Sequence, residues 1–260
     1  MTITSAQNQT VKMLKTLKTK KGRLQQGTFL LEGAKPLREA VASGAAIRRI
    51  VATPAAAEQY AALLPINTPV LLLQPQVFAT VCDTINAQGI AAEVELFKTS
   101  MANAIGKRFL LMLDTIADPG NMGTIIRTAD AVGVDCILYN EGCVDIYSPK
   151  VVRSTMGSIF HVPCVACDKA FTVIEPLKAA GTVFLAAHLQ GQNYFAAQTP
   201  QGSICLMIGS EAHGLQPEVA QKADYWVKIP MAGKAESLNA AVAAGILLYD
   251  IYQKRSGGAV

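Results

Sequence analysis

The sequence predicts an α/β protein with two domains, and three observations carry this prediction. The chain has 260 residues, a length that suits two domains. Apolar residues make up 51% of the chain and charged residues 16%, which is a globular rather than a disordered composition. Short apolar runs alternate with amphipathic stretches from end to end, which is the order expected when helices cover sheets.

The first 98 residues predict a complete α/β domain. Residues 5–27 have the pattern of a basic amphipathic helix, because Val11, Leu14 and Leu17 recur at helical spacing. Strands and helices then alternate. Strands are expected at 28–33, 47–53, 69–74 and 89–96, and helices at 34–44, 55–64 and 75–83. The polar segment 99–107 is the expected linker.

Residues 108–260 predict a second domain with a parallel sheet covered by helices. The run RFLLMLD at 108–114 is almost continuously apolar, as in a strand buried on both faces. Further strands are expected at 134–140, 158–163, 182–188, 203–209 and 225–230. Helices are expected to begin near Asn121, Pro149, Asp168, Gln216 and Glu236.

The net charge of +4 is unevenly distributed. The first 50 residues contain ten Lys and Arg and only two acids, so they carry +8 and the other 210 residues carry −4. A basic segment on an acidic body indicates a polyanionic partner such as nucleic acid, although a solvated basic helix would account for the charge equally well.

Targeting and cysteine patterns predict a cytoplasmic protein. No apolar run reaches the roughly 18 residues of a membrane helix, and the N-terminus lacks the apolar core of a signal peptide. We therefore expect no membrane partner and six reduced cysteines. The single pair Cys164-x-x-Cys167 has no second pair to complete a zinc site, so no metal is expected.

The first segment suited to chemistry covers residues 114–133. Asp118-Pro119-Gly120 is a turn signal after a buried strand, and Asn121 is placed to cap the helix that follows. Ligands of open α/β sheets bind beyond the carboxyl ends of strands, where this turn lies. The alternative is an ordinary turn and helix with a surface pair of Arg127 and Asp130.

The second segment covers residues 206–215. An apolar strand ends in Gly209, and Ser210 and Glu211 follow before Gly214. Glycines let a ligand approach the backbone, and an acid directly after a buried strand is costly without a partner. The alternative is a glycine turn with an acid that caps a helix.

The third segment covers residues 229–250. Ser237 and Asn239 are expected in the first turn of a long helix, where free N–H groups favour polar partners. The helix is apolar on two sides, which predicts one face on its own sheet and another on a second subunit. The alternative is a helix enclosed within one chain.

Taken together, the motifs NMGTIIRTAD, IGSEAHGL and IPMAGKAESLNAAVA resemble, in order and spacing, those of SpoU (TrmH-like) RNA methyltransferases of the SPOUT superfamily. The N-terminal run ITSAQNQTVKMLKTLKTKKGR resembles the substrate-binding domain often fused to these enzymes, which has a fold like certain ribosomal proteins. The resemblance implies a C-terminal α/β domain threaded into a trefoil knot, and a homodimer. It also implies methyl transfer from S-adenosylmethionine to a ribose 2′-hydroxyl, most simply of ribosomal RNA, with transfer RNA as the alternative.

The resemblance also assigns site residues. The cofactor-binding residues are expected to be Gly209, Ile229, Met231, Gly233 and Leu238. The expected catalytic residues are Arg127, Asn121, Glu211, Ser237 and Asn239. The expected RNA-binding residues are Lys12, Lys15, Lys20, Lys21, Arg23 and Arg38.

Arg127 is expected to bind RNA phosphate and to stabilise developing alkoxide charge, because a guanidinium is a poor base. Solvent or the phosphate could remove the proton. Two other classes of protein are disfavoured: a non-catalytic RNA-binding protein would not need the polar residues of these motifs, and a Rossmann enzyme would need a glycine-rich turn after residues 109–113.

Overall fold

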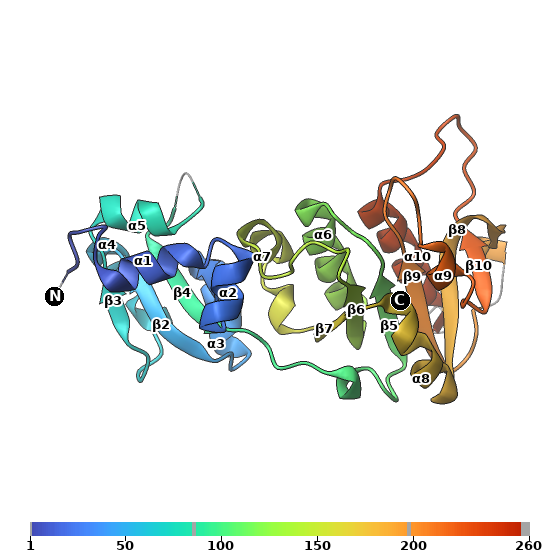
Figure 1. The fold of residues 1–260 in the computed structure, drawn as a ribbon, viewed down its shortest axis with the longest axis horizontal. Helices are drawn as coiled ribbons and strands as arrows, with labels where there is room; N and C mark the ends of the chain where they lie inside the picture. The colour runs from blue at the N-terminus through green and yellow to red at the C-terminus, as the bar shows by residue number, and fades with distance from the viewer. Residues whose placement is uncertain (1, 85–86, 197–198, 256–260) are drawn as a thin grey trace. The chain divides into compact units, whose positions relative to one another are not determined.

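The protein consists of two compact units (Figure 1). The computed structural model describes residues 2–84, 87–196 and 199–255. Unit 1 comprises Met1–Lys98 and Asp145–His161, and unit 2 comprises Thr99–Val144 and Val162–Val260. Among the described residues, no helix is long and apolar enough to cross a membrane.

Unit 1 contains a mixed four-stranded sheet of order β1-β4-β2-β3. Its strands are β1 (Thr28–Glu32), β2 (Ile47–Ala52), β3 (Val70–Leu72) and β4 (Ile90–Glu95). Strand β4 pairs antiparallel with β1 and β2, and β3 pairs parallel with β2. Its helices are α1 (Gln9–Thr16), α2 (Lys20–Gln26), α3 (Ala34–Ala42), α4 (Pro54–Gln59), α5 (Pro75–Val81) and α7 (Pro149–Thr155), with the 3₁₀ turns η1 (Ala61–Leu63) and η3 (Ser158–Phe160). The four strands expected in residues 1–98 are confirmed.

The single basic helix expected over residues 5–27 is wrong, because the chain forms α1 and α2 with a bend between them. Thr19 caps α2 by accepting a hydrogen bond from Gly22 N at 3.1 Å. A Cβ atom at Gly22 would lie 2.0 Å from the carbonyl oxygen of Thr16. Gly22, inside α2, therefore allows the backbones of the two helices to approach closely.

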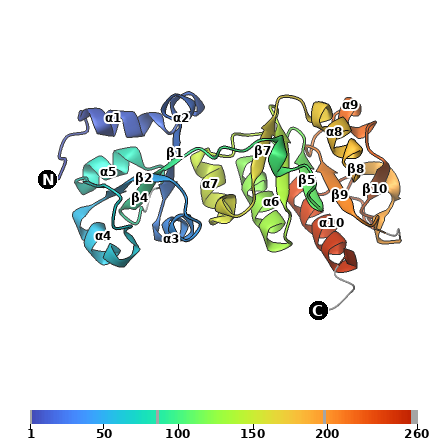
Figure 2. The same ribbon diagram turned by 90° about the horizontal axis from the view of Figure 1, so that it is seen from below.

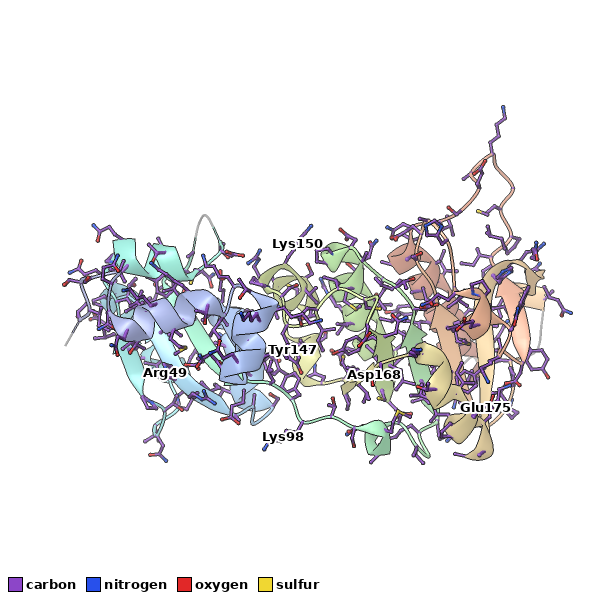
Figure 3. All side chains as sticks on the ribbon, viewed as in Figure 1. Arg49, Lys98, Tyr147, Lys150, Asp168 and Glu175 are labelled. Atoms are coloured by element: carbon purple, nitrogen blue, oxygen red, sulfur yellow. The ribbon has the colours of Figure 1, made fainter. Side chains whose placement is uncertain are left out.

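Residues 145–161 belong to unit 1, although the sequence placed them with the second domain. Tyr147 (labelled in Figure 3) accepts a hydrogen bond from Phe97 N at 3.2 Å, and Phe160 stacks on Phe29. The strand expected at 158–163 is wrong: Ser158–Phe160 is a 3₁₀ turn, and the next strand begins at Cys164. Ile159 and Phe160 of this run pack in the core of unit 1 and do not extend the other sheet.

Unit 2 contains a six-stranded sheet of order β10-β8-β9-β5-β6-β7, in which every pair is parallel, as expected. Its strands are β5 (Phe109–Leu113), β6 (Cys136–Asn140), β7 (Cys164–Cys167), β8 (Thr182–Asn193), β9 (Ser203–Ile208) and β10 (Tyr225–Lys228). Its helices are α6 (Pro119–Ala131), α8 (Ile174–Ala179), α9 (Pro217–Ala220) and α10 (Ala240–Arg255), with the 3₁₀ turns η2 (Met101–Asn103), η4 (Ala170–Val173) and η5 (Tyr194–Ala196). Figure 2 shows α6 and α10 on one face of the sheet and α8 and α9 on the other.

The expected linker, residues 99–107, packs on unit 2. The hydroxyl of Thr99 donates to Cys164 O at 2.8 Å, and Ala104 is buried in the core of this unit. The trefoil knot implied by the resemblance remains a prediction. The parallel order brings the segments that follow β5, β9 and β10 to one edge of the sheet, the edge at which α/β proteins bind ligands.

Candidate active site

Three side chains, one from each motif, are hydrogen-bonded at the carboxyl edge of the unit 2 sheet. Asn121 Nδ2 donates to Glu211 Oε1. Asn239 Nδ2 donates to Asn121 Oδ1 at 3.0 Å and lies 3.3 Å from Glu211 Oε1. We call these residues the Asn–Glu–Asn cluster. The structure thus brings together three of the five expected catalytic residues, from positions 118 and 28 residues apart in sequence.

Local sequence leaves the Asn121 side chain available for this cluster. Helix α6 begins at Pro119, and its cap is Asp118, whose Oδ1 accepts from Asn121 N at 2.8 Å. The expectation that Asn121 caps the helix is therefore wrong. An aspartate cap followed by proline is a strong helix start. Because Asp118 satisfies the backbone of Asn121, the amide of Asn121 can reach Glu211.

Helix α10 begins later than expected, at Ala240. Asn239 caps it: its Oδ1 accepts from Ala241 N at 3.0 Å and from Val242 N at 3.2 Å. The amide of Asn239 therefore caps with its oxygen and binds the cluster with its nitrogen. The sequence analysis expected Ser237 in the first turn of this helix, and this is wrong. Ser237 lies in the exposed segment before the helix.

The turn after β9 folds back on itself and directs Glu211 outward. Ser210 and Gly214 exchange two backbone hydrogen bonds, of 3.0 and 2.9 Å. A Cβ atom at Gly209 would lie 2.0 Å from the carbonyl carbon of Gly214 and 2.2 Å from Leu215 N. Glycine at 209 is therefore required by the turn itself, and Glu211 at its tip is exposed.

A second polar cluster, which the sequence did not reveal, binds the residue that follows this turn to the end of β5. The carboxylate of Asp114, at the end of β5, is fully buried. It accepts from Asn140 Nδ2 at 2.6 Å, from Gln216 N at 2.6 Å and from Gln216 Nε2 at 2.7 Å. We call these three residues the Asp114 cluster. The only signal in the sequence was an acid directly after an apolar strand.

A cavity of about 460 Å³ lies between the turn after β9 and the segment before α10. Of the expected cofactor residues, Gly209, Ile229, Met231 and Leu238 line it, and Gly233 does not. Ser237 and Glu211 also line it, as does His188 on β8, which the sequence analysis did not assign to the site. Within the described chain, the backbone of residues 230–238 forms no backbone–backbone hydrogen bond, so its polar groups are available to a ligand.

Arg127 is not part of the Asn–Glu–Asn cluster. It is exposed on α6 and does not line the 460 Å³ cavity. Among the described residues it has no hydrogen bond or ion pair to Asn121, Glu211 or Asn239. Its place on α6 therefore gives it access to solvent or to another molecule.

The basic residues expected to bind RNA divide into two groups. Lys12, Lys20, Lys21 and Arg38 are exposed and Lys15 is half-buried. Arg23 differs, because its side chain is only 4% exposed and lies 2.5 Å from Asp145 Oδ2. Its Nη1 also donates to Leu17 O at 2.7 Å. Arg23 is therefore buried and engaged within unit 1, so the structure does not support the expectation that it contacts RNA.

Fold and site together define an α/β protein with a ligand cavity at the carboxyl edge of a parallel sheet. The SpoU rRNA Methylase family matches residues 108–249 of the chain, and the MRM3-like substrate binding domain matches residues 8–92. The chain belongs to the SpoU rRNA methylase family.

Known relatives extend over nearly the whole chain. The 23S rRNA (guanosine(2553)-2′-O)-methyltransferase RlmP of Bacillus subtilis is 35% identical over 96% of this chain and 98% of its own length. The AdoMet-bound rRNA methyltransferase of Sinorhizobium meliloti superposes with a TM-score of 0.88 at 33% identity, covering 98% of each chain. The SpoU methyltransferase AviRb of Streptomyces viridochromogenes, in complex with AdoMet, has a TM-score of 0.89 at 30% identity, covering 97% of this chain and all of its own.

Proposed function

We propose that this protein transfers a methyl group from S-adenosylmethionine to a ribose 2′-hydroxyl of ribosomal RNA. The observation that carries the proposal is the junction of the three motifs: the Asn–Glu–Asn cluster joins them, and its Glu211 lines a cavity of cofactor size. The relatives named above include an rRNA 2′-O-methyltransferase and two AdoMet-bound structures.

The cavity fits S-adenosylmethionine by the chemistry of its lining. Ile229 and Leu238 offer apolar walls to an adenine ring, and the free backbone of residues 230–238 offers donors and acceptors to its edge. Glu211 and Ser237 offer polar groups to the amino acid part. When bound, the cofactor would supply an electrophilic methyl group on a sulfonium sulfur, which leaves as a neutral thioether and is therefore a very good leaving group.

The protein's own residues then have to position the ribose, since positioning dominates when the leaving group is good. Within the Asn–Glu–Asn cluster, Glu211 is held by two amide donors, so its carboxylate has a fixed orientation. Arg127 binds RNA phosphate and stabilises the developing charge on the 2′-oxygen. Water or the RNA phosphate accepts the hydroxyl proton, because a guanidinium remains protonated.

The proposal includes a homodimer formed through unit 2. Helix α10 buries one face, with Ala244, Leu248 and Ile251 inside. Its other face exposes apolar side chains, since Val242 is 50% and Tyr249 51% exposed. An exposed apolar helix face of this kind favours a second subunit. In such a dimer Arg127 would lie near the other subunit, because its helix α6 packs against α10.

Unit 1 is proposed to bind RNA and unit 2 to catalyse, in the cytoplasm. Lys12, Lys15, Lys20, Lys21 and Arg38 supply positive charge along the surface of unit 1. Charges of this kind contact the phosphate backbone and position an RNA without reading its bases.

The test is transfer of labelled methyl from S-adenosylmethionine to purified ribosomal and transfer RNA. The wild type is expected to label ribosomal RNA at one alkali-stable dinucleotide, and Arg127→Ala to lose at least 90% of the rate. Lys222→Gln, which removes a charge paired with Glu175 in the same unit, serves as the control with unchanged rate. Label in transfer RNA alone would show that the substrate is transfer RNA and not ribosomal RNA. No label in either RNA would contradict the proposal.

A further inference from the structure

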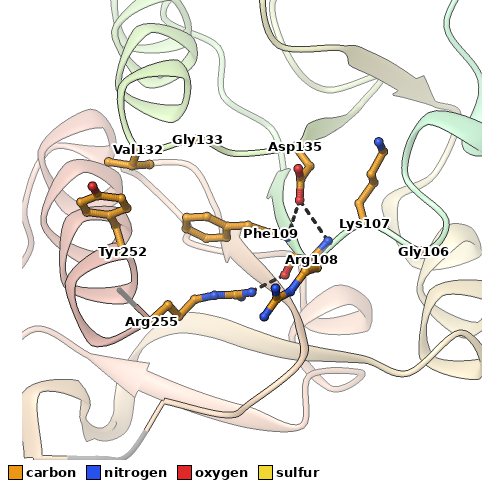
Figure 4. Close-up of a pocket in the computed structure, with 9 residues that line it drawn as sticks. All are labelled: Gly106, Lys107, Arg108, Phe109, Val132, Gly133, Asp135, Tyr252 and Arg255. Atoms are coloured by element: carbon orange, nitrogen blue, oxygen red, sulfur yellow. Dashed lines mark hydrogen bonds between the residues drawn. The ribbon is translucent and has the colours of Figure 1, made fainter. Parts of the chain in front are cut away.

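A second cavity, of about 350 Å³, lies at the amino edge of the unit 2 sheet. It is bounded by residues 106–109 before and at the start of β5, by Val132, Gly133 and Asp135 before β6, and by Tyr252 and Arg255 near the end of α10 (Figure 4). Because the strands are parallel, this edge is opposite to the one that carries the Asn–Glu–Asn cluster. The two cavities share no lining residue.

Positive charge dominates the lining of this amino-edge cavity. Lys107, Arg108 and Arg255 line it, against one acid, Asp135. Asp135 Oδ2 is already engaged by two backbone groups, Arg108 N at 3.0 Å and Phe109 N at 2.8 Å. Within the described residues, neither Lys107 nor the guanidinium of Arg108 forms an ion pair with a carboxylate. The three cations therefore exceed the local negative charge.

Arg255 is fixed in place at the wall of the cavity. Its Nη1 donates to Arg108 O at 2.9 Å, and its guanidinium lies 5.5 Å from the centre of the Phe109 ring. Figure 4 shows the side chains of Arg108 and Arg255 directed toward the same part of the cavity. Burial, and next the charge of Arg108, lower the pKa of Arg255. The two guanidinium groups therefore repel each other unless an anion lies between them.

We propose that the amino-edge cavity binds a phosphate group between Arg108, Arg255 and Lys107. Guanidinium groups match phosphate oxygens with paired, charge-assisted hydrogen bonds, and a lysine adds a point charge. The phosphate would replace the missing negative charge and relieve the repulsion between the two arginines. Its source is either the backbone of an RNA that extends around unit 2 or a free phosphate-bearing molecule. The site does not depend on methyl transfer, since it is tested by binding alone.

The experiment measures two ligands on the full-length protein. Titration calorimetry with pyrophosphate measures binding of a free phosphate compound, and filter binding of ribosomal RNA over a series of salt concentrations measures the RNA backbone. Variants are Arg108→Gln and Arg108→Lys, with Lys222→Gln as the control for loss of one charge elsewhere on unit 2. Circular dichroism verifies that each variant is folded.

Arg108→Gln is expected to lower the affinity for phosphate about tenfold, which is the cost of one charge-assisted hydrogen bond. Arg108→Lys should recover part of the loss, and Lys222→Gln should change nothing. A lower RNA salt slope, by about one unit, identifies RNA phosphate as the ligand, whereas weaker pyrophosphate binding with unchanged RNA affinity identifies a free phosphate compound. The proposal is overturned if Arg108→Gln alters neither ligand, or if Lys222→Gln weakens both as much.

Discussion

The two polar clusters at the carboxyl edge of the unit 2 sheet are about equally rich in hydrogen bonds but differ in exposure. The Asp114 cluster is closed: its carboxylate is fully buried and accepts three hydrogen bonds from Asn140 and Gln216. The Asn–Glu–Asn cluster is open: Glu211 and Asn239 are exposed beside a 460 Å³ cavity.

This difference in exposure assigns a structural role to the Asp114 cluster and a functional role to the Asn–Glu–Asn cluster. Burying a charge is expensive unless its oxygens are satisfied, and in the Asp114 cluster the partners of this carboxylate hold the strand ends and the turn together. An exposed cluster contributes little to stability, and its hydrogen-bonding capacity remains available to a ligand. We therefore expect substitutions in the first cluster to unfold the protein and substitutions in the second to stop the reaction.

Asp114→Ala should have the largest effect on stability. It removes three hydrogen bonds and leaves the amide of Asn140 buried without its acceptor. The expected loss in free energy of unfolding is about 3–5 kcal/mol, measured by urea denaturation. Asp168→Ala, at an exposed aspartate in the same unit (labelled in Figure 3), should change it by less than about 0.5 kcal/mol. Equal losses in the two variants would remove the distinction between the clusters.

Gly209→Ala tests the turn that joins the two clusters. The added methyl group would collide with the backbone of Gly214 and Leu215, so the turn must move. We expect a loss of about 2–3 kcal/mol in the free energy of unfolding and at least tenfold weaker binding of S-adenosylmethionine, measured by calorimetry. Gly233→Ala is the matched control for stability, because nothing lies within 4 Å of its Cβ position. Tight cofactor binding by Gly209→Ala would contradict this role of the turn.

The open cluster was easier to predict from sequence than the closed one. Asn121, Glu211 and Asn239 belong to motifs with recognisable order, and the parallel sheet brings those motifs to one edge. The Asp114 cluster depends on pairs 26 and 102 residues apart, and a single sequence does not show which buried polar groups pair. The apolar run at 158–163 was misassigned for a related reason: its hydrophobicity predicts burial but not which core receives it.

Asn239→Ala should cost about 1 kcal/mol in free energy of unfolding, because it removes the cap of α10. It should also lower methyl transfer, because the link from Asn239 to Asn121 and Glu211 is lost. Asn239→Ser separates the two roles, since serine caps a helix equally well but is too short to reach Glu211. We expect Asn239→Ser to keep the stability of the wild type and to lose activity. Recovery of activity along with stability would assign Asn239 to helix capping alone.

Glu211→Gln should have the smallest effect on stability and a large one on the reaction. Glu211 is exposed at the tip of its turn, so the free energy of unfolding should change by less than about 0.5 kcal/mol. Glutamine keeps the size of the side chain but removes the charge that accepts from Asn121 and Asn239. We expect at least a tenfold fall in kcat/KM for methyl transfer, whereas Glu218→Gln, an exposed glutamate on α9, should leave it unchanged. If Glu211→Gln retained full activity with normal stability, the open cluster would be a feature of the surface, and the positioning of the ribose would have to depend on Arg127 and the cavity walls.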